Sequence, residues 1–310
     1  MTIQSEEDLK SAYKHLEKGN LIQARKILDN LVMDNLENAE VTFAIYCCSY
    51  WGDFVCHLPE LDLFEQGDGI LFKWKSFQKE LQTEKKKTFE RTLYHVQTGI
   101  FTLAYNVFSA LENEKNVVQK GEILLNKGIC CKKLGKYETA LSYLTEAIKF
   151  SPSSANTLAE MADCYALCGM ERQAKVLFRE AFFVDAQKID LAFLDSELIC
   201  CLIRTVQEKG YVGNALQEWI PVYGVLLGIF NIRRELRGQE VGKLKQEIYA
   251  KENENKNPIN DSKILTPKLI NMYFWLIDHY VQTKDSGRKI NEILLKIKII
   301  DRDIYDLYIK

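Results

Sequence analysis

The clearest pattern of apolar and polar residues lies between residues 121 and 188, where two consecutive segments of equal length share one spacing. A fixed period of this size is typical of helical repeat arrays, in which each repeat buries its apolar face against the next. Small or apolar residues recur at matching offsets in the two copies, namely Leu124 and Leu158, Gly128 and Ala162, Cys130 and Cys164, Gly135 and Gly169, Ala140 and Ala174, Leu144 and Phe178, and Ala147 and Ala181.

Each copy predicts two helices joined by a tight turn. In residues 121–134 the apolar and small side chains follow steps of three and four, which places them on one helical stripe. Gly135 is expected to end this helix, because the residue after a helix often needs the positive φ that glycine adopts freely. Ala140 and Ala147 allow the second helix to approach the first closely. Pro152 should end the second helix, since proline has no backbone N–H.

These positions resemble the tetratricopeptide (TPR) repeat. The resemblance implies an all-α fold, a right-handed superhelical solenoid of helix–turn–helix repeats with extra flanking helices. The first copy departs from the pattern at Lys127 and Cys131, and the second copy at Glu171 and Ala186. The matching residues are Gly128, Gly135, Tyr137, Ala140, Leu144, Ala147 and Pro152 in the first copy and Ala162, Tyr165, Gly169, Ala174, Phe178 and Ala181 in the second.

Weaker patterns extend the helical prediction over the rest of the chain. Gly19, Ala24 and Leu28 keep the internal spacing of the clear copies, which indicates a diverged N-terminal repeat. We expect diverged TPR-like helices at 1–64, a long helix pair at 65–118, two clear repeats at 119–188, a diverged repeat with lengthened helices at 189–250, a polar linker or loop at 251–266, and C-terminal capping helices at 267–310.

Glycine and proline mark the expected element boundaries. The EQGDG segment at 65–69 predicts a loop, followed by helices over 70–82 and 85–112. A long helix is expected from 190 to 209, ended by Gly210. Thr266 before Pro267 is a typical start of a helix, because proline is tolerated in a first turn.

Two uncharged stretches raise the question of membrane contact. Residues 93–111 are long enough to span a bilayer, but a polar stripe runs along them from His95 to Ser109, which favours a central packing helix. Residues 219–232 are too short for a simple span and contain Pro221, so we expect a kinked core helix there. Contact of either stretch with a membrane is the alternative.

Charge and composition exclude several functional classes. The chain has 41 basic and 43 acidic residues, which gives no electrostatic reason to expect nucleic acid or an anionic membrane as the partner. The acidic N-terminal segment lacks the apolar core of a secretory signal, so we expect a cytoplasmic protein. Nine cysteines without such a signal indicate free, buried thiols rather than disulfides.

No motif for catalysis or cofactor binding is found in the sequence. A phosphate-binding P-loop, a Gly–x–Ser–x–Gly nucleophile turn and a His–Glu–x–x–His zinc motif are all missing. Cys130, Cys131, Cys164 and Cys168 could surround a metal ion, but equivalent packing positions in the repeats explain them better. We therefore expect no enzyme activity, no metal and no cofactor.

The TPR resemblance implies a concave groove lined by the first helix of each repeat, which holds a peptide or an amphipathic helix of a partner protein. The lysine and asparagine carboxylate clamp of chaperone-binding relatives is missing, because Leu125 and Ile129 occupy those positions. Burial against a neighbouring helix is an equally good interpretation of these two residues. The implied groove residues are Glu122, Leu125, Ile129, Lys132, Lys133, Asn156, Ala159, Asp163 and Ala166.

Two functional hypotheses follow. The first is a non-catalytic scaffold or adaptor that binds a protein partner and helps to assemble a multiprotein complex. The alternative is a TPR-containing accessory or regulatory subunit whose C-terminal half, from residue 219 onward, associates with a membrane, as in a motility or secretion assembly. Neither hypothesis includes a small-molecule substrate or nucleic acid.

Overall fold

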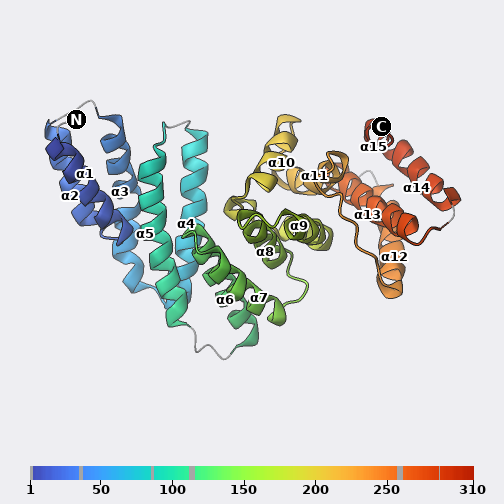
Figure 1. The fold of residues 1–310 in the computed structure, drawn as a ribbon, viewed down its shortest axis with the longest axis horizontal. Helices are drawn as coiled ribbons and strands as arrows, with labels where there is room; N and C mark the ends of the chain where they lie inside the picture. The colour runs from blue at the N-terminus through green and yellow to red at the C-terminus, as the bar shows by residue number, and fades with distance from the viewer. Residues whose placement is uncertain (1–2, 35–37, 85–86, 112–115, 257–260, 286) are drawn as a thin grey trace. The chain divides into compact units, whose positions relative to one another are not determined.

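The computed structural model describes residues 3–34, 38–84, 87–111, 116–256, 261–285 and 287–310. Within these ranges the chain forms α-helices and short 3-10 turns and has no β-strand, which confirms the all-α prediction (Figure 1). Contacts divide the chain into two compact units, residues 1–151 and residues 152–310. The division falls inside the segment 119–188, so one predicted repeat lies in each unit.

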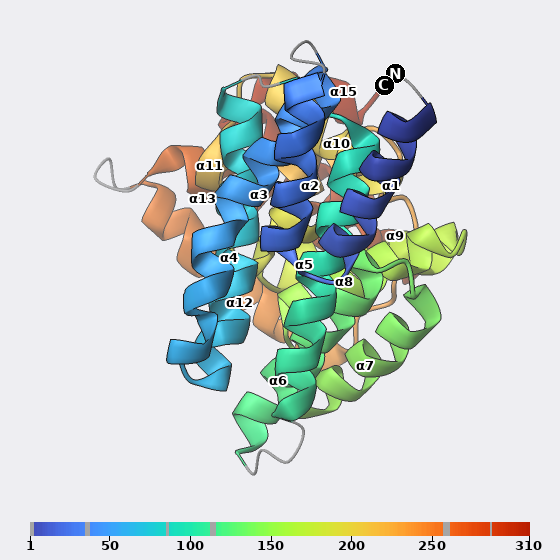
Figure 2. The same cartoon turned by 90° about the vertical axis from the view of Figure 1, so that its left-hand side faces the viewer.

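Unit 1 consists of helices that pack mainly against their neighbours in sequence. Figures 1 and 2 show α1 to α5 side by side with nearly parallel axes. The central helix is α5, which packs against α1, α3, α4 and α6. The helices are α1 (Ile3–Glu17), α2 (Leu21–Asp34), α3 (Ala39–His57), α4 (Leu63–Thr83), α5 (Glu90–Ala110), α6 (Val117–Lys133) and α7 (Tyr137–Phe150).

The first predicted repeat is the α6–α7 hairpin. Gly135 has a φ of +74° and lies in the turn, as its spacing predicted. A Cβ atom on Gly128 would lie 2.7 Å from the Leu144 side chain, so only glycine permits this contact between α6 and α7. Ala140 and Ala147 are buried in the same interface. The N-terminal α1–α2 hairpin uses the same device, with Gly19 at a φ of +72°.

The predicted loop at 65–69 is instead the first part of α4. Asp62 caps this helix: its carboxylate accepts hydrogen bonds from the backbone N–H groups of Phe64 and Glu65, at 2.8 and 2.9 Å. Gly67 is needed for packing rather than for a turn, because a Cβ atom there would lie 2.5 Å from the Phe108 ring of α5. The glycine that indicated a loop in the sequence is therefore a helix residue at a close contact between α4 and α5.

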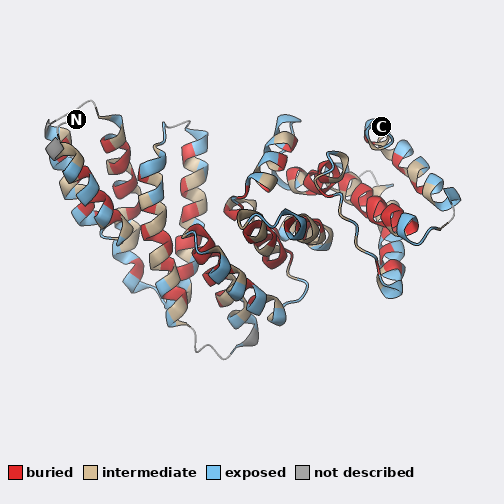
Figure 3. Cartoon of the chain, in the orientation of Figure 1, coloured by how far each residue is buried: buried red, intermediate tan, exposed pale blue. Residues whose placement is uncertain are grey.

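Unit 2 contains the second predicted repeat and the C-terminal helices. The pairs α8 with α9, α10 with α11, α12 with α13, and α14 with α15 pack together, and α13 also contacts α11 and α14. Figure 3 shows α13 buried along most of its length. The helices are α8 (Ala155–Leu167), α9 (Glu171–Asp185), α10 (Glu197–Glu208), α11 (Gly213–Leu226), α12 (Gly238–Asn255), α13 (Ser262–Gln282), α14 (Gly287–Ile300) and α15 (Arg302–Tyr308).

The α8–α9 hairpin shares the turn geometry and the buried small residues of the α6–α7 hairpin. Gly169 has a φ of +76° in its turn. Ala162, Ala174, Phe178 and Ala181 are fully buried, like their counterparts in the first copy. Each copy is thus a pair of closely packed helices.

The predicted long helix over 190–209 is wrong in its first part. Residues 189–196 contain no α-helix. They include one short 3-10 turn, Leu191–Phe193, and α10 begins only at Glu197. The cause is a set of side-chain hydrogen bonds from α8. Asn156 Oδ1 accepts from the Asp190 N–H at 2.9 Å, and the Asp163 carboxylate accepts from the N–H groups of Asp195 and Ser196, both at 2.8 Å. These bonds satisfy backbone donors that a continuous helix would have used itself.

The predicted kinked helix over 219–232 ends early, at Leu226. Pro221 lies inside the helix, and the residues around it are buried, as expected for a core segment. The chain leaves the helix because Gly228 adopts a φ of +71° and the Phe230 ring then folds back onto Gly224. The Phe230 N–H donates to the Gly224 carbonyl at 2.8 Å, which closes this turn.

The predicted linker at 251–266 is largely helical where the structure describes it. Helix α12 continues to Asn255 and α13 begins at Ser262, while 257–260 lie outside the described residues. The helix start predicted at Thr266 and Pro267 is therefore wrong. Asp261 caps α13 instead, because its carboxylate accepts from the Lys263 N–H at 3.0 Å.

Neither uncharged stretch forms a membrane-spanning helix. Among the residues that the structure describes, no helix is both long and apolar enough to cross a bilayer. The polar stripe of α5 from His95 to Ser109 is half-buried or exposed, whereas the opposite side, with Phe101 and Phe108, is fully buried. This confirms α5 as a packing helix.

The contact between α1 and α5 yields a testable prediction on two glycines. A Cβ atom on Gly99 would lie 1.9 Å from the Leu16 carbonyl oxygen, whereas a Cβ atom on Gly52 of α3 meets nothing within 4 Å. We expect Gly99→Ala to lower the free energy of unfolding by about 2 kcal/mol or more, because backbone must move. Gly52→Ala should raise it by up to ~1 kcal/mol through helix propensity. Urea unfolding followed by circular dichroism measures both, and equal stability of the two variants would contradict the close α1–α5 contact.

Candidate functional site

The predicted groove residues of unit 1 lie mostly inside the helix packing. Helix α6 packs against α5 and α7, and Ile129 is only 2 % exposed. Lys132 and Lys133 are also buried, and the Lys133 carbonyl accepts a hydrogen bond from Gln97 of α5 at 2.8 Å. Leu125 is half-buried. The helix-contact interpretation therefore accounts for Ile129.

The predicted groove residues of unit 2 are also engaged within their own unit. Ala159 is fully buried, and Ala166 is half-buried. Asn156 and Asp163 hold the backbone of segment 189–196 through the hydrogen bonds described above. Of the nine residues predicted to line a groove, Glu122 alone is exposed. Binding of a partner at these positions stays a prediction, and exposed surface of a suitable shape lies elsewhere.

A long groove in unit 2 is formed by α12, α13 and α14. Helix α13 packs against both α12 and α14 and forms the floor. The groove holds two cavities of about 280 and 250 Å³. Side chains at helical spacing line it throughout: Lys245, Ile248, Tyr249, Glu252, Asn255 and Lys256 from α12, Leu269, Tyr273, Leu276 and Tyr280 from α13, and Lys289, Glu292, Ile293, Lys296, Ile299 and Ile300 from α14.

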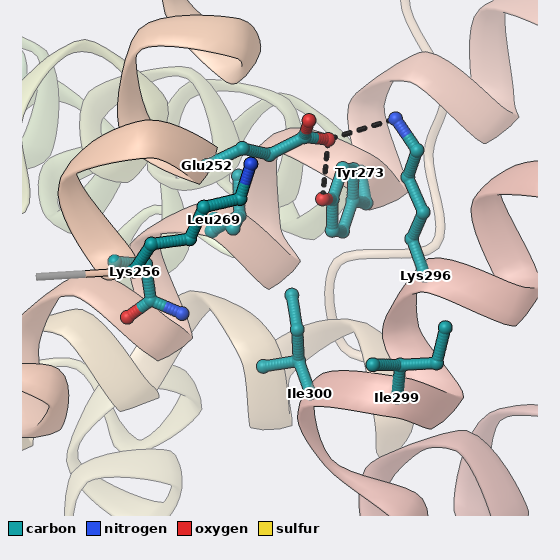
Figure 4. A pocket seen from close by; sticks show the side chains of 8 residues that line it. Glu252, Lys256, Leu269, Tyr273, Lys296, Ile299 and Ile300 are labelled. Carbon is teal, nitrogen blue, oxygen red and sulfur yellow. Dashed lines mark hydrogen bonds and ion pairs between the residues drawn. The ribbon is translucent and has the colours of Figure 1, made fainter.

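An ion pair spans the groove between its two cavities. Lys296 Nζ on α14 donates to Glu252 Oε1 on α12 at 2.8 Å, and the Tyr273 hydroxyl donates to the same oxygen at 2.8 Å (Figure 4). Burial raises the pKa of Glu252, but the hydrogen bonds from Lys296 and Tyr273 outweigh it, so the pKa lies below its ordinary value of 4.5. Burial and the bond to Glu252 raise the pKa of Tyr273. This three-residue contact sets the spacing of the two walls.

A second set of ion pairs positions α12 against the rest of unit 2. Arg234 bridges Glu180 of α9 at 3.0 Å and Glu240 of α12 at 3.0 Å. Glu240 also accepts from the Arg237 N–H at 2.7 Å, which caps the start of α12. In the interior, Arg179 of α9 pairs with Asp278 of α13. The segment between α11 and α12, which contains Arg234, is therefore held against α9 by its ion pair with Glu180.

The groove carries an excess of positive charge. Four lysines line it against two glutamates. Lys245 and Lys289 both approach the Tyr280 ring, each with Nζ 5.5 Å from the ring centroid. Lys289 pairs with Asp285 at 2.7 Å. Lys245 and Lys256, near the two ends of the α12 wall, form no ion pair among the described residues.

Large apolar side chains project around the groove. Ile299 of α14 is 75 % exposed, and Leu295, one turn earlier, is 56 % exposed. Tyr249 of α12 is 69 % exposed on the opposite wall. Apolar residues in α14 therefore occupy more than the side that packs on α13, which is buried through Ile293 and Ile297.

Sequence reasoning missed this groove although a signal for it was present. The segment 286–299 has apolar residues on two sides of a helix, at the buried positions Ile293 and Ile297 and at the exposed positions Leu295 and Ile299. One helix needs a single apolar stripe to pack on its own chain. A second stripe indicates a surface available to something else.

The cysteines offer no alternative site. Among the described residues, no group of histidine, cysteine, aspartate or glutamate side chains is arranged to hold a metal ion. Cys130 and Cys131 are buried free thiols, and burial raises the pKa of both. A thiol with a raised pKa is a poor nucleophile at neutral pH.

Burial of Ile129 leads to a prediction on the groove that sequence reasoning expected. Ile129→Asp should lower the free energy of unfolding by about 3 kcal/mol or more, because it places a charge in a packed interface. Val118→Asp on the same helix, where the side chain is 77 % exposed, should change it by less than ~0.5 kcal/mol. Both are measured by urea unfolding. If the Ile129→Asp protein were as stable as the unsubstituted protein, Ile129 would have to lie on the surface, as the groove prediction required.

The bridge across the groove should make stability depend on pH. Because the folded pKa of Glu252 lies below its ordinary value, its contribution is fully present above about pH 4.5 and is lost as the pH falls through the lower folded pKa. We expect Glu252→Gln to reduce stability by about 1 kcal/mol at pH 7 and by clearly less at about pH 3. Thermal melts at both pH values test this. The exposed Glu235→Gln variant is the control, and a deficit of Glu252→Gln that is as large at pH 3 as at pH 7 would contradict the assignment.

The groove offers a surface suited to binding. Its floor and walls offer apolar surface, its ends offer ammonium groups, and its most buried carboxylate is engaged by Lys296 and Tyr273. Such a surface suits an apolar segment with acidic flanks. The chain matches no protein-family model, no curated protein and no solved structure.

Proposed function

We propose that the chain is a non-catalytic helical adaptor that binds an amphipathic helix of a partner protein in the α12–α13–α14 groove. The observation that carries this proposal is the alignment of two cavities along three helices, one mainly apolar and one of mixed character, with exposed apolar residues on both walls. The function of joining proteins into a complex follows from holding such a segment.

The dimensions of the groove favour a helix as the occupant. The α12 wall extends from Lys245 to Lys256, which corresponds to about 17 Å at 1.5 Å per residue. Three turns of a partner helix have this length. A helix presents apolar residues every three or four positions, which matches two cavities separated by one ion pair.

The charges of the groove favour acidic residues on that helix. Lys245 and Lys256 are placed near the two ends of the α12 wall and lack carboxylate partners among the described residues. An acidic residue beside each end of the apolar segment would pair with them and fix the direction of binding. A basic helix would be repelled by Lys245 and Lys256, since Lys289 and Lys296 are paired with carboxylates.

The two hairpins support a wider architecture. We propose that α6–α7 and α8–α9 are TPR-like repeats of a right-handed solenoid, with the remaining helices as diverged repeats and caps. Two observations support this proposal. Each turn has a glycine with a positive φ, and small residues at matching positions are buried in both hairpins. In this interpretation the C-terminal helices end the array and provide its binding surface.

Site-specific photo-cross-linking in the native cell tests the binding function. A photoreactive residue at Ile299 should cross-link to a partner segment that has an apolar helical stripe flanked by aspartate or glutamate, as mapped by mass spectrometry. The same residue at Val118, exposed to a similar extent in unit 1, is the matched control. Identical cross-links from both positions, or none from Ile299, would argue against the groove.

A synthetic peptide of the mapped segment then provides the quantitative test. Ile299→Asp should weaken its binding at least tenfold, because a carboxylate replaces an apolar contact and repels the acidic flanks. Val118→Asp should leave the affinity unchanged. Fluorescence polarisation measures both variants, and circular dichroism checks that each is folded. Unchanged affinity of Ile299→Asp would overturn the proposal.

A further inference from the structure

A separate polar cavity lies on the other side of α12. It has a volume of about 330 Å³ and lies among the last turn of α9, α11, α12 and α13. Helix α12 contributes Glu247, Lys251 and Glu254 to this cavity and a different stripe to the groove, so the two sites share no residue. The volume suits a small molecule rather than a peptide.

A buried carboxylate faces this cavity with only a neutral partner. Glu218 of α11 is 3 % exposed, and its Oε1 accepts from the Gln187 side-chain amide at 2.9 Å. Its Oε2 makes no hydrogen bond within the described residues. Burial raises the pKa of Glu218 despite the nearby charges of Lys268 and Lys251. A buried carboxylate is stabilised most by a cation at hydrogen-bond distance.

An unpartnered amide faces the same cavity. Asn271 of α13 is 5 % exposed, lines the cavity, and makes no side-chain hydrogen bond within the part of the chain that the structure describes. Its amide atoms are not among the fully enclosed polar atoms that lack a partner, so water or a ligand in the cavity can reach them. This residue indicates a ligand independently of the acidic side chains.

The charge of the lining selects a cation. Four acidic residues, Asp185, Glu218, Glu247 and Glu254, line the cavity against the two lysines Lys251 and Lys268. The cavity also lies at the C-terminal end of α9, where the helix dipole adds partial negative charge. Lys251 is already paired with Glu254 at 2.6 Å, which leaves Glu218 and Glu247 available.

The lining also indicates what kind of cation. No group of carboxylates among the described residues is arranged for a metal ion. Phe182, Phe183 and Met272 supply apolar surface beside the carboxylates. Methylene groups with ammonium ends match this combination of apolar and acidic side chains.

We propose that this cavity binds a small aliphatic di- or polyamine, with Glu218 and Glu247 accepting from ammonium groups and the Asn271 amide oxygen accepting a further N–H. The methylene chain lies against Phe182 and Met272. Lys268 limits the affinity, because its ammonium group competes with the ligand for Glu218.

Isothermal titration calorimetry of the full chain with putrescine and spermidine tests this proposal. Both amines should bind, and 1,4-butanediol, the neutral analogue of putrescine, should not. Magnesium chloride at matched ionic strength controls for screening of surface charge. Absence of binding at millimolar amine, or equal heats with butanediol or magnesium, would overturn the proposal.

Two variants assign the binding to the cavity. Glu218→Gln keeps the shape of the side chain and should weaken spermidine binding at least tenfold, because it removes a charge-assisted hydrogen bond. Lys268→Met should tighten it severalfold, because it removes a competing cation. A purely structural effect of substitution would not increase affinity, so the second variant remains informative if the first is poorly folded. Glu235→Gln, exposed and outside the cavity, is the control. Unchanged affinity of both cavity variants would place the binding elsewhere.

Discussion

The close approach of neighbouring helices at small residues is the constraint on which the helix packing of this protein depends. The Leu16 carbonyl approaches Gly99 so closely that a methyl group has no room, and Leu144 occupies the space beside Gly128. Because packed interiors tolerate little added volume, these contacts fix both the distance and the rotation of each helix. The rotation in turn decides which stripe of a helix is buried and which remains exposed.

Unit 2 adds a second kind of constraint, made of charges. Arg179 and Asp278 pair in the interior, and Arg234 joins α9 to the start of α12 through Glu180 and Glu240. Buried ion pairs contribute little net stability, since each charge loses its hydration. Their directional bonds nevertheless fix where the chain between α11 and α12 lies. Helix α12 is thereby held so that one of its stripes faces the α13–α14 groove and another faces the polar cavity.

The two proposed sites are lined by different stripes of α12 and differ in polarity and charge. The groove combines apolar surface with lysines near the ends of its α12 wall, which suits a helix with acidic flanks, whereas the cavity is acidic with a buried amide, which suits a small cation. Neither coincides with the face of α6 and α8 that the TPR resemblance implied. In α8 that face is used to hold segment 189–196 through Asn156 and Asp163, and in α6 it packs with Ile129 buried.

The sequence by itself determined the all-helical fold, the turns at Gly135, Gly169 and Gly210 and the paired helices between residues 121 and 185, because periodicity and glycine chemistry are local. It did not determine which structural role each glycine has: Gly67 indicated a loop, yet it lies in a helix and permits close contact with Phe108. Nor could it show that Asp163 captures backbone N–H groups more than thirty residues away, or that Glu252 meets Lys296. Those outcomes depend on which helices become neighbours, and only the tertiary structure brings residues so distant along the chain within hydrogen-bond distance.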